Sequence, residues 1–255
     1  MRMRVALLSL AVFCLWNASA RAETFSFSDG DFNDSDWGIE FFNFRTGGTA
    51  PAGQEATGGN PDSYRSVVLT TNPAPNPSEN SSIYAFHAYI PGVVDPSVDG
   101  AIVSFDLFWD VRPGPDTFGN GGFTGPALRQ GDRFYVSAGL LEFVGTTQVW
   151  RSVDRLDLIE ANFGRIQDTL GIDPADDPDF SASGEPITFG FFTALAGGIG
   201  GGSLSLTQGY DNWSVVVQTV PEPSPVPALS LWSLPLIAAL LLVSSFLVLR
   251  SRPEN

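Results

Sequence analysis

The sequence predicts an all-β domain, a single β-sandwich or jelly roll of about ten strands with one short helix. Short runs of β-branched and aromatic residues alternate along the chain with turns of Gly, Pro, Asn and Asp. In one run apolar residues occupy every second position, which is typical of a strand with one buried face. These residues are Ala101, Val103, Phe105, Leu107 and Trp109.

The expected strands follow one another along the exported part of the chain. They are Glu23–Ser28, Gly38–Arg45, Tyr64–Thr70, Ile83–Ile90, Ala101–Trp109, Arg133–Phe143, Gln148–Val153, Ile187–Leu195, Ser203–Thr207 and Asn212–Gln218. Pro-rich, Gly-rich or acidic stretches between them are expected to be loops. These are Thr71–Ser78, Gly119–Gly125, Asp173–Asp179 and Gly197–Gly202.

The short helix is expected between Asp154, which can cap its start, and Gly171, which can end it. Apolar residues recur there at intervals of three and four, which indicates an amphipathic helix. They are Leu156, Ile159, Phe163, Ile166 and Leu170.

Residues 1–22 are predicted to be a secretory signal peptide. Two arginines precede the uncharged apolar run Val5–Trp16, which has the length of a signal core and is too short to span a bilayer. Small residues at Ala20 and Ala22 predict cleavage before Glu23 by signal peptidase.

A second cleavage choice lies at Ala18-Ser19-Ala20. The single cysteine, Cys14, lies in the apolar run of the signal. Its removal leaves a domain that must be stable without disulfides.

Residues 228–249 are predicted to form a transmembrane helix. The run Ala228–Leu249 has no charged residue, and a helix of this length spans ~33 Å, enough for a bilayer core of ~30 Å. Arg250 and Arg252 follow it and are expected to stay in the cytoplasm, as part of a short tail of residues 250–255, with the domain outside.

The segment of residues 220–227, between domain and helix, begins with the motif Val220-Pro221-Glu222-Pro223 and reads as an extended, Pro-rich linker. This motif, an apolar helix and a terminal Arg, in that order, resemble the PEP-CTERM sorting signal. The resemblance implies recognition by an exosortase, a membrane transpeptidase of bacteria that make exopolysaccharide. It implies nothing about the domain from residue 23 to 219.

The tail also resembles the related IPTL-CTERM signal through Pro227, Leu229, Ser230 and Trp232. Ala228 and Ser233 depart from that signal. The type of sorting enzyme therefore stays open. Within the domain, Gly59-Asn60-Pro61 and Tyr210–Val215 resemble jelly-roll domains of PEP-CTERM proteins, and the first phrase also resembles laminin-IV-type domains.

Charge limits the partners of the exported part. The chain has no lysine, and between the two ends eight arginines stand against 26 acidic residues, a formal charge of −18. Such a surface repels nucleic-acid phosphates and anionic lipid. It suits a solvated extracellular protein or one that binds cations.

An acidic run offers a candidate calcium site. Asp29, Asp31, Asn33 and Asp36 gather oxygen ligands in one short segment, and oxygen is the ligand that Ca²⁺ prefers. The spacing is partly that of an EF-hand, but Asp34 occupies the position that needs Gly. The alternative is a solvated turn between two strands.

Catalytic residues are sparse. His87 is the only histidine and lies in an expected strand, so we expect a structural role. Removal of the signal with Cys14 leaves no Cys–His pair, and one histidine cannot make a His-rich zinc site. A Ser–His–Asp triad stays open as an alternative, but the sequence has no Gly-x-Ser-x-Gly nucleophile turn. The chain is therefore expected not to be an enzyme. Trp150 is the best candidate for stacking on a sugar ring, whereas Trp109 and Trp213 are expected in the core.

Three functions remain in order of preference. The first is a structural or adhesive component of the cell surface or extracellular matrix, exported, held by its membrane helix and then released by sorting. The second is a module that binds extracellular polysaccharide, which a concave sheet face lined by exposed aromatic residues would favour. The third is a glycoside hydrolase or lyase, which two facing carboxylates in a deep cleft would favour.

Overall fold

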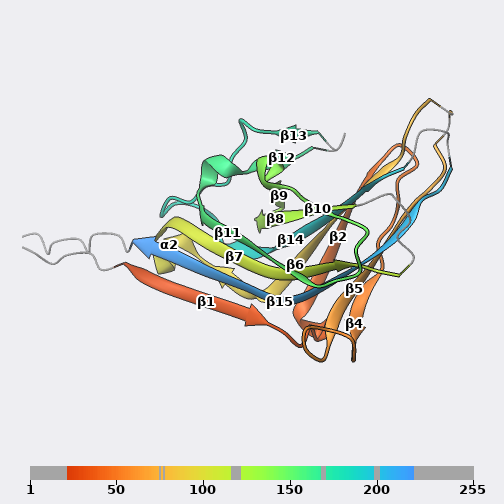
Figure 1. The fold of residues 1–255 in the computed structure, drawn as a ribbon. Helices are drawn as coiled ribbons and strands as arrows, with labels where there is room; N and C mark the ends of the chain where they lie inside the picture. The colour runs from red at the N-terminus through yellow and green to blue at the C-terminus, as the bar shows by residue number, and fades with distance from the viewer. Residues whose placement is uncertain are drawn as a thin grey trace, which may run out of the picture. The chain divides into compact units, whose positions relative to one another are not determined.

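The computed structural model describes residues 22–220, except 75, 77, 116–121, 168–170 and 198–201. Two antiparallel sheets pack against each other as a β-sandwich (Figure 1), which confirms the predicted fold class. The predicted membrane helix and all but the last residue of the predicted signal lie outside these residues. None of the helices formed by the described residues is long and apolar enough to cross a membrane.

The first sheet has seven strands in the described residues, with the order β11-β7-β15-β5-β3; β1 also pairs with β15, and β4 with β5. The strands are β1 (Glu23–Asp29), β3 (Gly48–Thr49), β4 (Ala52–Glu55), β5 (Tyr64–Thr71), β7 (Ala101–Pro113), β11 (Arg151–Leu158) and β15 (Ser205–Val220). Glu23 pairs with Thr219, so the domain begins and ends at the same end of this sheet (Figure 1).

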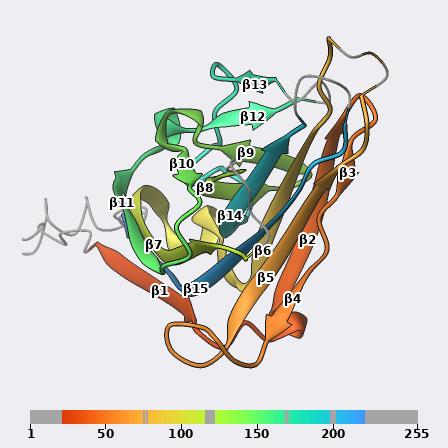
Figure 2. The ribbon, with the colours of Figure 1, turned by 45° about the vertical axis from the view of Figure 1, so that its right-hand side comes forward.

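The second sheet has eight strands in the described residues, with the order β13-β12-β9-β8-β14-β6-β2, and β10 also pairs with β8. The strands are β2 (Trp37–Phe44), β6 (Ser82–Val94), β8 (Gly122–Gln130), β9 (Arg133–Val136), β10 (Glu142–Val144), β12 (Gly164–Ile166), β13 (Ile172–Asp173) and β14 (Ile187–Ala196). Figure 2 shows β2, β6 and β14 running alongside one another.

The predicted helix between Asp154 and Gly171 is wrong. Strand β11 runs to Leu158, and a 3₁₀ turn at Glu160–Asn162 and strand β12 follow it. A bulge between Arg155 and Leu158 adds an extra step to the strand, so that apolar residues fall three and four apart without a helix. The short α-helix of the described residues is instead α2 (Pro96–Asp99).

Three strand predictions change in detail. Arg133–Phe143 is two strands, β9 and β10, separated by a 3₁₀ turn at Ala138–Leu140. The two expected strands between Ser203 and Gln218 are one long strand, β15. Strand β8 was missed because its start was read as part of a Gly-rich loop; its backbone nevertheless pairs with three neighbours.

The main core lies between the two sheets and contains Trp109 and Trp213, as predicted; both are almost fully buried. The Trp213 ring meets Trp37 edge-on at 5.3 Å. Val103, expected on the buried face of its strand, is 51% exposed because the pairing of β7 with β15 shifts register beside it. Farther along β7 the predicted alternation of buried and outward-facing residues is confirmed, with Phe105 and Leu107 buried.

His87 lies within this core and is fully buried, as expected of a structural histidine. Its ring stacks on Phe191 at 4.7 Å. Arg65 Nε donates to His87 Nδ1 at 3.4 Å, so the imidazole proton belongs on Nε2, which faces the Thr193 hydroxyl at 3.3 Å. Burial and the neighbouring Arg65 charge hold the pKa of His87 well below its ordinary value of 6.5.

This shift predicts how stability depends on pH. The unfolded chain protonates its histidine below pH ~6.5 while folded His87 stays neutral, so the unfolded state binds more protons. The free energy of unfolding should therefore fall as pH drops below ~6.5, by up to ~1.4 kcal/mol per pH unit, until folded His87 itself titrates. Urea unfolding of the wild type and His87→Gln across this range measures it. An identical pH slope in both proteins would contradict the assignment.

Candidate functional site

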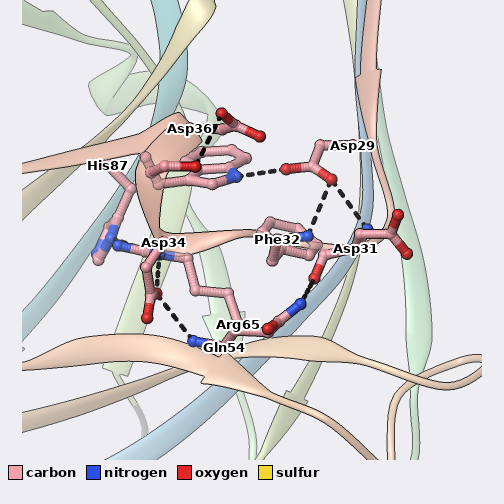
Figure 3. A network of polar contacts seen from close by, with 10 residues as sticks. Asp29, Asp31, Phe32, Asp34, Asp36, Gln54, Arg65 and His87 are labelled. Atoms are coloured by element: carbon pink, nitrogen blue, oxygen red, sulfur yellow. Dashed lines mark hydrogen bonds and ion pairs between the residues drawn. The ribbon is translucent and has the colours of Figure 1, made fainter.

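The acidic run of residues 29–36 is a hydrogen-bonded turn in the described structure (Figure 3). Asp29 Oδ1 accepts the backbone N–H groups of Asp31 and Phe32, both at 2.9 Å. Its Oδ2 accepts Trp37 Nε1–H at 2.7 Å. Asp36 accepts a hydrogen bond from Ser35 at 3.3 Å. Among the described residues, no three His, Cys, Asp or Glu side chains converge as metal ligands would, and the calcium site stays a prediction.

A buried arginine adjoins this turn. Arg65 is 2% exposed, and its Nη1 lies 3.6 Å from Asp34 Oδ1, which also accepts the backbone N–H of Gln54 at 3.0 Å (Figure 3). Burial lowers the pKa of Arg65 to about 10, and the charges of Asp34 and Asp29 oppose that change. Part of the negative charge of the run therefore serves to balance Arg65, a partner that the sequence did not suggest.

Trp150, the predicted sugar-stacking residue, is half-buried and held by its neighbours. Its Nε1–H donates to the Gly58 carbonyl at 3.2 Å. Tyr64 meets the ring edge-on at 5.6 Å, and the Arg112 guanidinium lies 4.7 Å from the ring centre. The ring also lines an open hollow of about 250 Å³. Trp150 is thus fixed in place, with part of its surface free.

A carboxylate pair lies on the outer face of the first sheet. Asp110 and Asp211 are opposite each other on β7 and β15 and are 6% and 0% exposed. Asp110 Oδ2 accepts the side-chain amides of Asn60 at 2.9 Å and Asn212 at 2.8 Å, and Asp211 accepts the Asn60 backbone N–H. Burial, together with the Asp110 charge, raises the pKa of Asp211 against these hydrogen bonds. The pair holds the loop containing Asn60, so its geometry is not that of two acids facing across an open cleft.

The clearest grouping of exposed aromatic side chains lies on the outer face of the second sheet. Register places Phe42 opposite Tyr84, Tyr84 opposite Ala194, Ala194 opposite Phe123 and Phe123 opposite Phe143. Directly opposed residues share a face of a sheet. Phe42, Tyr84, Phe123 and Phe143 thus form one continuous row across β2, β6, β14, β8 and β10, with Ala194 in the middle, which we call the aromatic row.

Alternation along the strands shows that this face is the outer one. Ile83 and Ala85 of β6 belong to the core between the sheets. Tyr84 and Phe86 belong instead to a second apolar cluster on the other side of the sheet. This second cluster consists of Phe86, Ala88, Ala127, Val136, Ile166, Phe192 and Ala194, with Phe42, Phe44, Tyr84, Phe134 and Ile172 packed against it.

The outer face is concave. Phe42 on β2 and Phe134 on β9 are four strand spacings apart in the sheet order, a distance of ~19 Å if the sheet were flat. Their ring centres are nevertheless 4.9 Å apart, and Phe134 also meets Phe86 of β6 at 5.5 Å. Only a sheet curled toward its outer side brings these rings together.

The row is accessible from solvent. Phe123 is 42% and Phe143 50% exposed, with ring centres 5.6 Å apart; Phe42 and Tyr84 are half-buried. Burial raises the pKa of the Tyr84 hydroxyl, which stays protonated and can donate a hydrogen bond. The surface therefore offers aromatic rings at four positions across five strands, with one hydroxyl among them.

The sequence alone does not mark the four residues of the aromatic row as a site. A signal was present, since Tyr84–Ala88 and Ile187–Leu195 are apolar at both odd and even positions, which indicates strands buried on two faces. The cross-strand alignment of Phe42 with Phe143 depends on register and strand order, which composition does not encode.

The predicted sorting residues are mostly beyond the described part of the chain. Val220 is the last residue of β15, pairs with Ala101 and is 40% exposed. The others lie outside the described residues: Pro221, Glu222, Pro223, Pro227, Leu229, Ser230, Trp232, Arg250 and Arg252.

Comparison with known proteins gives structural neighbours only. No family model matches the chain, and no curated protein matches it. A family 11 carbohydrate-binding module from Clostridium thermocellum, solved with a β-1,3-1,4-mixed-linked tetrasaccharide, is 13% identical with a TM-score of 0.43, over 74% of this chain and 94% of its own.

Two further solved structures are similar to the chain. One comes from work on promiscuous carbohydrate-binding modules of the β-sandwich superfamily; it is 9% identical with a TM-score of 0.39, over 73% of this chain and 61% of its own. The other is a module studied for specific mannan recognition, 13% identical with a TM-score of 0.32, over 77% of this chain and 98% of its own.

Proposed function

We propose that the domain binds a neutral extracellular polysaccharide, without catalysis, through the aromatic row. The observation that carries the proposal is the register itself. Phe42, Tyr84, Phe123 and Phe143 lie in one row across a concave face, and two of them are about half exposed. A concave face lined by aromatic residues favours polysaccharide binding over a purely structural role.

The chemistry of the row suits sugar rings. A pyranose presents C–H bonds on its flat faces, and an aromatic ring offers large apolar contact area with only two side-chain torsions to immobilise. Rings spread over five neighbouring strands match a chain of several sugars better than a compact ligand. The Tyr84 hydroxyl can add a hydrogen bond to a sugar hydroxyl.

Charge favours a neutral polymer. The exported part carries a formal charge of −18, and a like-charged polyuronate would be repelled as it approached. A neutral chain meets no such barrier. The row residues are themselves uncharged, so stacking and hydroxyl contacts supply the binding energy.

The absence of catalysis remains part of the proposal. Asp110 and Asp211 accept hydrogen bonds from Asn60 and Asn212 and do not face the row, because they belong to the other sheet. His87 is sealed in the core.

Export and sorting complete the proposal. Residues 1–22 would direct export, residues 228–249 would hold the chain in the membrane, and Val220–Pro223 would be the site read by an exosortase. Strand β1 begins at Glu23, directly after the expected signal, and β15 ends at Val220, the first residue of the expected sorting motif. Binding of polysaccharide would then give the protein an adhesive role at the cell surface or in the matrix.

Replacing row residues should weaken polysaccharide binding. Phe123→Ala and Tyr84→Ala each remove a central aromatic contact, which typically costs ~2 kcal/mol, or more than tenfold in affinity. Affinity electrophoresis in gels containing mixed-linked β-glucan, xylan, mannan or a polyuronate measures retention. We expect retention of the wild type in at least one neutral polymer and none in the polyuronate.

Phe41→Ala is the matched control. Phe41 is next to Phe42 and 45% exposed, but it pairs with Ala85 on the opposite face of the sheet. Its truncation should leave retention unchanged. Retention lost equally in the Phe41 and Phe123 variants, or seen in the polyuronate gel alone, would contradict the proposal.

The sorting proposal has its own test. Changing Pro221–Pro223 to Gly and Ser leaves β15 intact, since the strand ends at Val220, and should block release from the membrane in a host that carries an exosortase. Changing Leu229 and Trp232 to Ala is the control for the alternative signal. Fractionation and immunoblotting report release. Equal release of the Pro221–Pro223 variant and the wild type would refute sorting at this motif.

A further inference from the structure

We infer that the aromatic row continues around the edge of the sandwich, past Phe143, into the hollow beside Trp150, so that the protein holds an internal stretch of a long polysaccharide chain. The inference rests on the proposed function and adds a second contact region, which lies where the second sheet, carrying the whole row, meets strands β7 and β11 of the first sheet.

Phe143 connects the two regions. It is the last aromatic residue of the row and pairs with Phe123. It also lines the open hollow of about 250 Å³ together with Pro113, Gly145, Thr147, Val149, Trp150 and Arg151. A chain that lies along the row therefore meets a further apolar surface directly beyond Phe143.

The walls of the hollow suit another sugar. Val149 is 63% exposed and Pro113 is buried, so the hollow offers apolar surface next to the polar side chains of Thr147 and Arg151. The Trp150 ring is held by Gly58, Tyr64 and Arg112 through the contacts described above. A ring fixed in advance loses little side-chain entropy when a ligand stacks on it.

Ion pairs between β10 and β11 fix the position of the hollow relative to the row. Glu142 of β10 accepts hydrogen bonds from Arg151 and from Arg155 of β11, the latter at 2.8 Å, and Arg151 also donates to the Phe143 carbonyl. Burial would raise the pKa of Glu142, but these two arginines lower it below its ordinary value. These ion pairs join a strand of the second sheet to a strand of the first, at the point where the ligand would cross from one to the other.

With two contact regions, the binding affinity should depend on the length of the polysaccharide chain. A short oligosaccharide can occupy the row alone, whereas a longer chain reaches the hollow as well and gains the second contact without a second loss of translational freedom. The wild type should therefore bind the long polymer at least roughly tenfold more tightly, per site, than a tetrasaccharide of the same sugar.

Isothermal titration calorimetry tests this length dependence. The ligands are the neutral polymer whose gel retains the wild type, for example mixed-linked β-glucan, and the tetrasaccharide of the same polymer. Val149→Glu places a charge in the hollow at an exposed position and should reduce polymer affinity to the tetrasaccharide level while leaving tetrasaccharide affinity unchanged. Trp150→Ala should do the same, with thermal unfolding reporting whether the variant folds. Val98→Glu, at a valine of α2 that is 78% exposed, is the matched control and should behave as wild type.

The outcomes separate the two claims. Wild-type polymer affinity in Val149→Glu, or equal wild-type affinity for polymer and tetrasaccharide, would overturn the extension and leave the row intact. Loss of tetrasaccharide binding in Val149→Glu would also overturn it, because the hollow would then be part of the first contact. No binding of any neutral polymer by the wild type would refute the proposed function itself.

Discussion

The packing of Phe134 against Phe42 and Phe86 is the constraint on which the proposed site depends. It draws β9 toward β2 across the outer face of the eight-stranded sheet. The curl that results buries Phe192 and Ala194 in the second apolar cluster, with Phe42 and Tyr84 packed against it, and leaves Phe123 and Phe143 of the row exposed. Edge-to-face ring pairs of this kind contribute ~0.5–1.5 kcal/mol per pair beyond the burial of their area, so the curl is stabilised by the same type of side chain that we propose binds the ligand.

Several buried charged side chains have partners close by, both in the core between the sheets and on the outer face of the first sheet. Arg65 is buried between the sheets, donates to neutral His87 and faces Asp34 of the acidic turn. Asp110 and Asp211 accept the amides of Asn60 and Asn212. Burying a charge without partners is costly, and these contacts explain why a chain with so many acidic residues keeps several of its polar side chains inside.

Much of the fold could be predicted from alternation and turn residues. The β-sandwich, the strands around Glu23, Tyr64, Ile83 and Ile187, and the burial of Trp109 and Trp213 all follow from period-two patterns and aromatic content. The helix near Leu156 was wrong because a bulge in β11 changed the spacing of apolar residues. Strand β8 was not predicted because its glycines indicated a loop. It pairs through its backbone with β14 on one side and β9 on the other, and this pairing does not depend on the side chains.

The site could not be predicted in the same way, because it is a property of register. Nothing local marks Phe42, Tyr84, Phe123 and Phe143 as neighbours, since they lie on four strands far apart in the sequence. Trp150, chosen from sequence for its chemistry, is held by Tyr64 and Arg112 of the first sheet. A single residue type can thus be chosen from the sequence, whereas a surface made by four strands is seen only once their pairing is known.

The most direct test of the central claim is to locate the ligand rather than to measure its affinity. The domain is titrated with the tetrasaccharide of the neutral polymer that it binds in the gels. Aromatic ¹H–¹³C NMR signals then report each ring separately. The account predicts that Phe42, Tyr84, Phe123 and Phe143 shift together with a single dissociation constant while Phe41 stays unchanged. Shifts confined to rings outside the row, with Tyr84 and Phe123 unaffected at saturation, would contradict it.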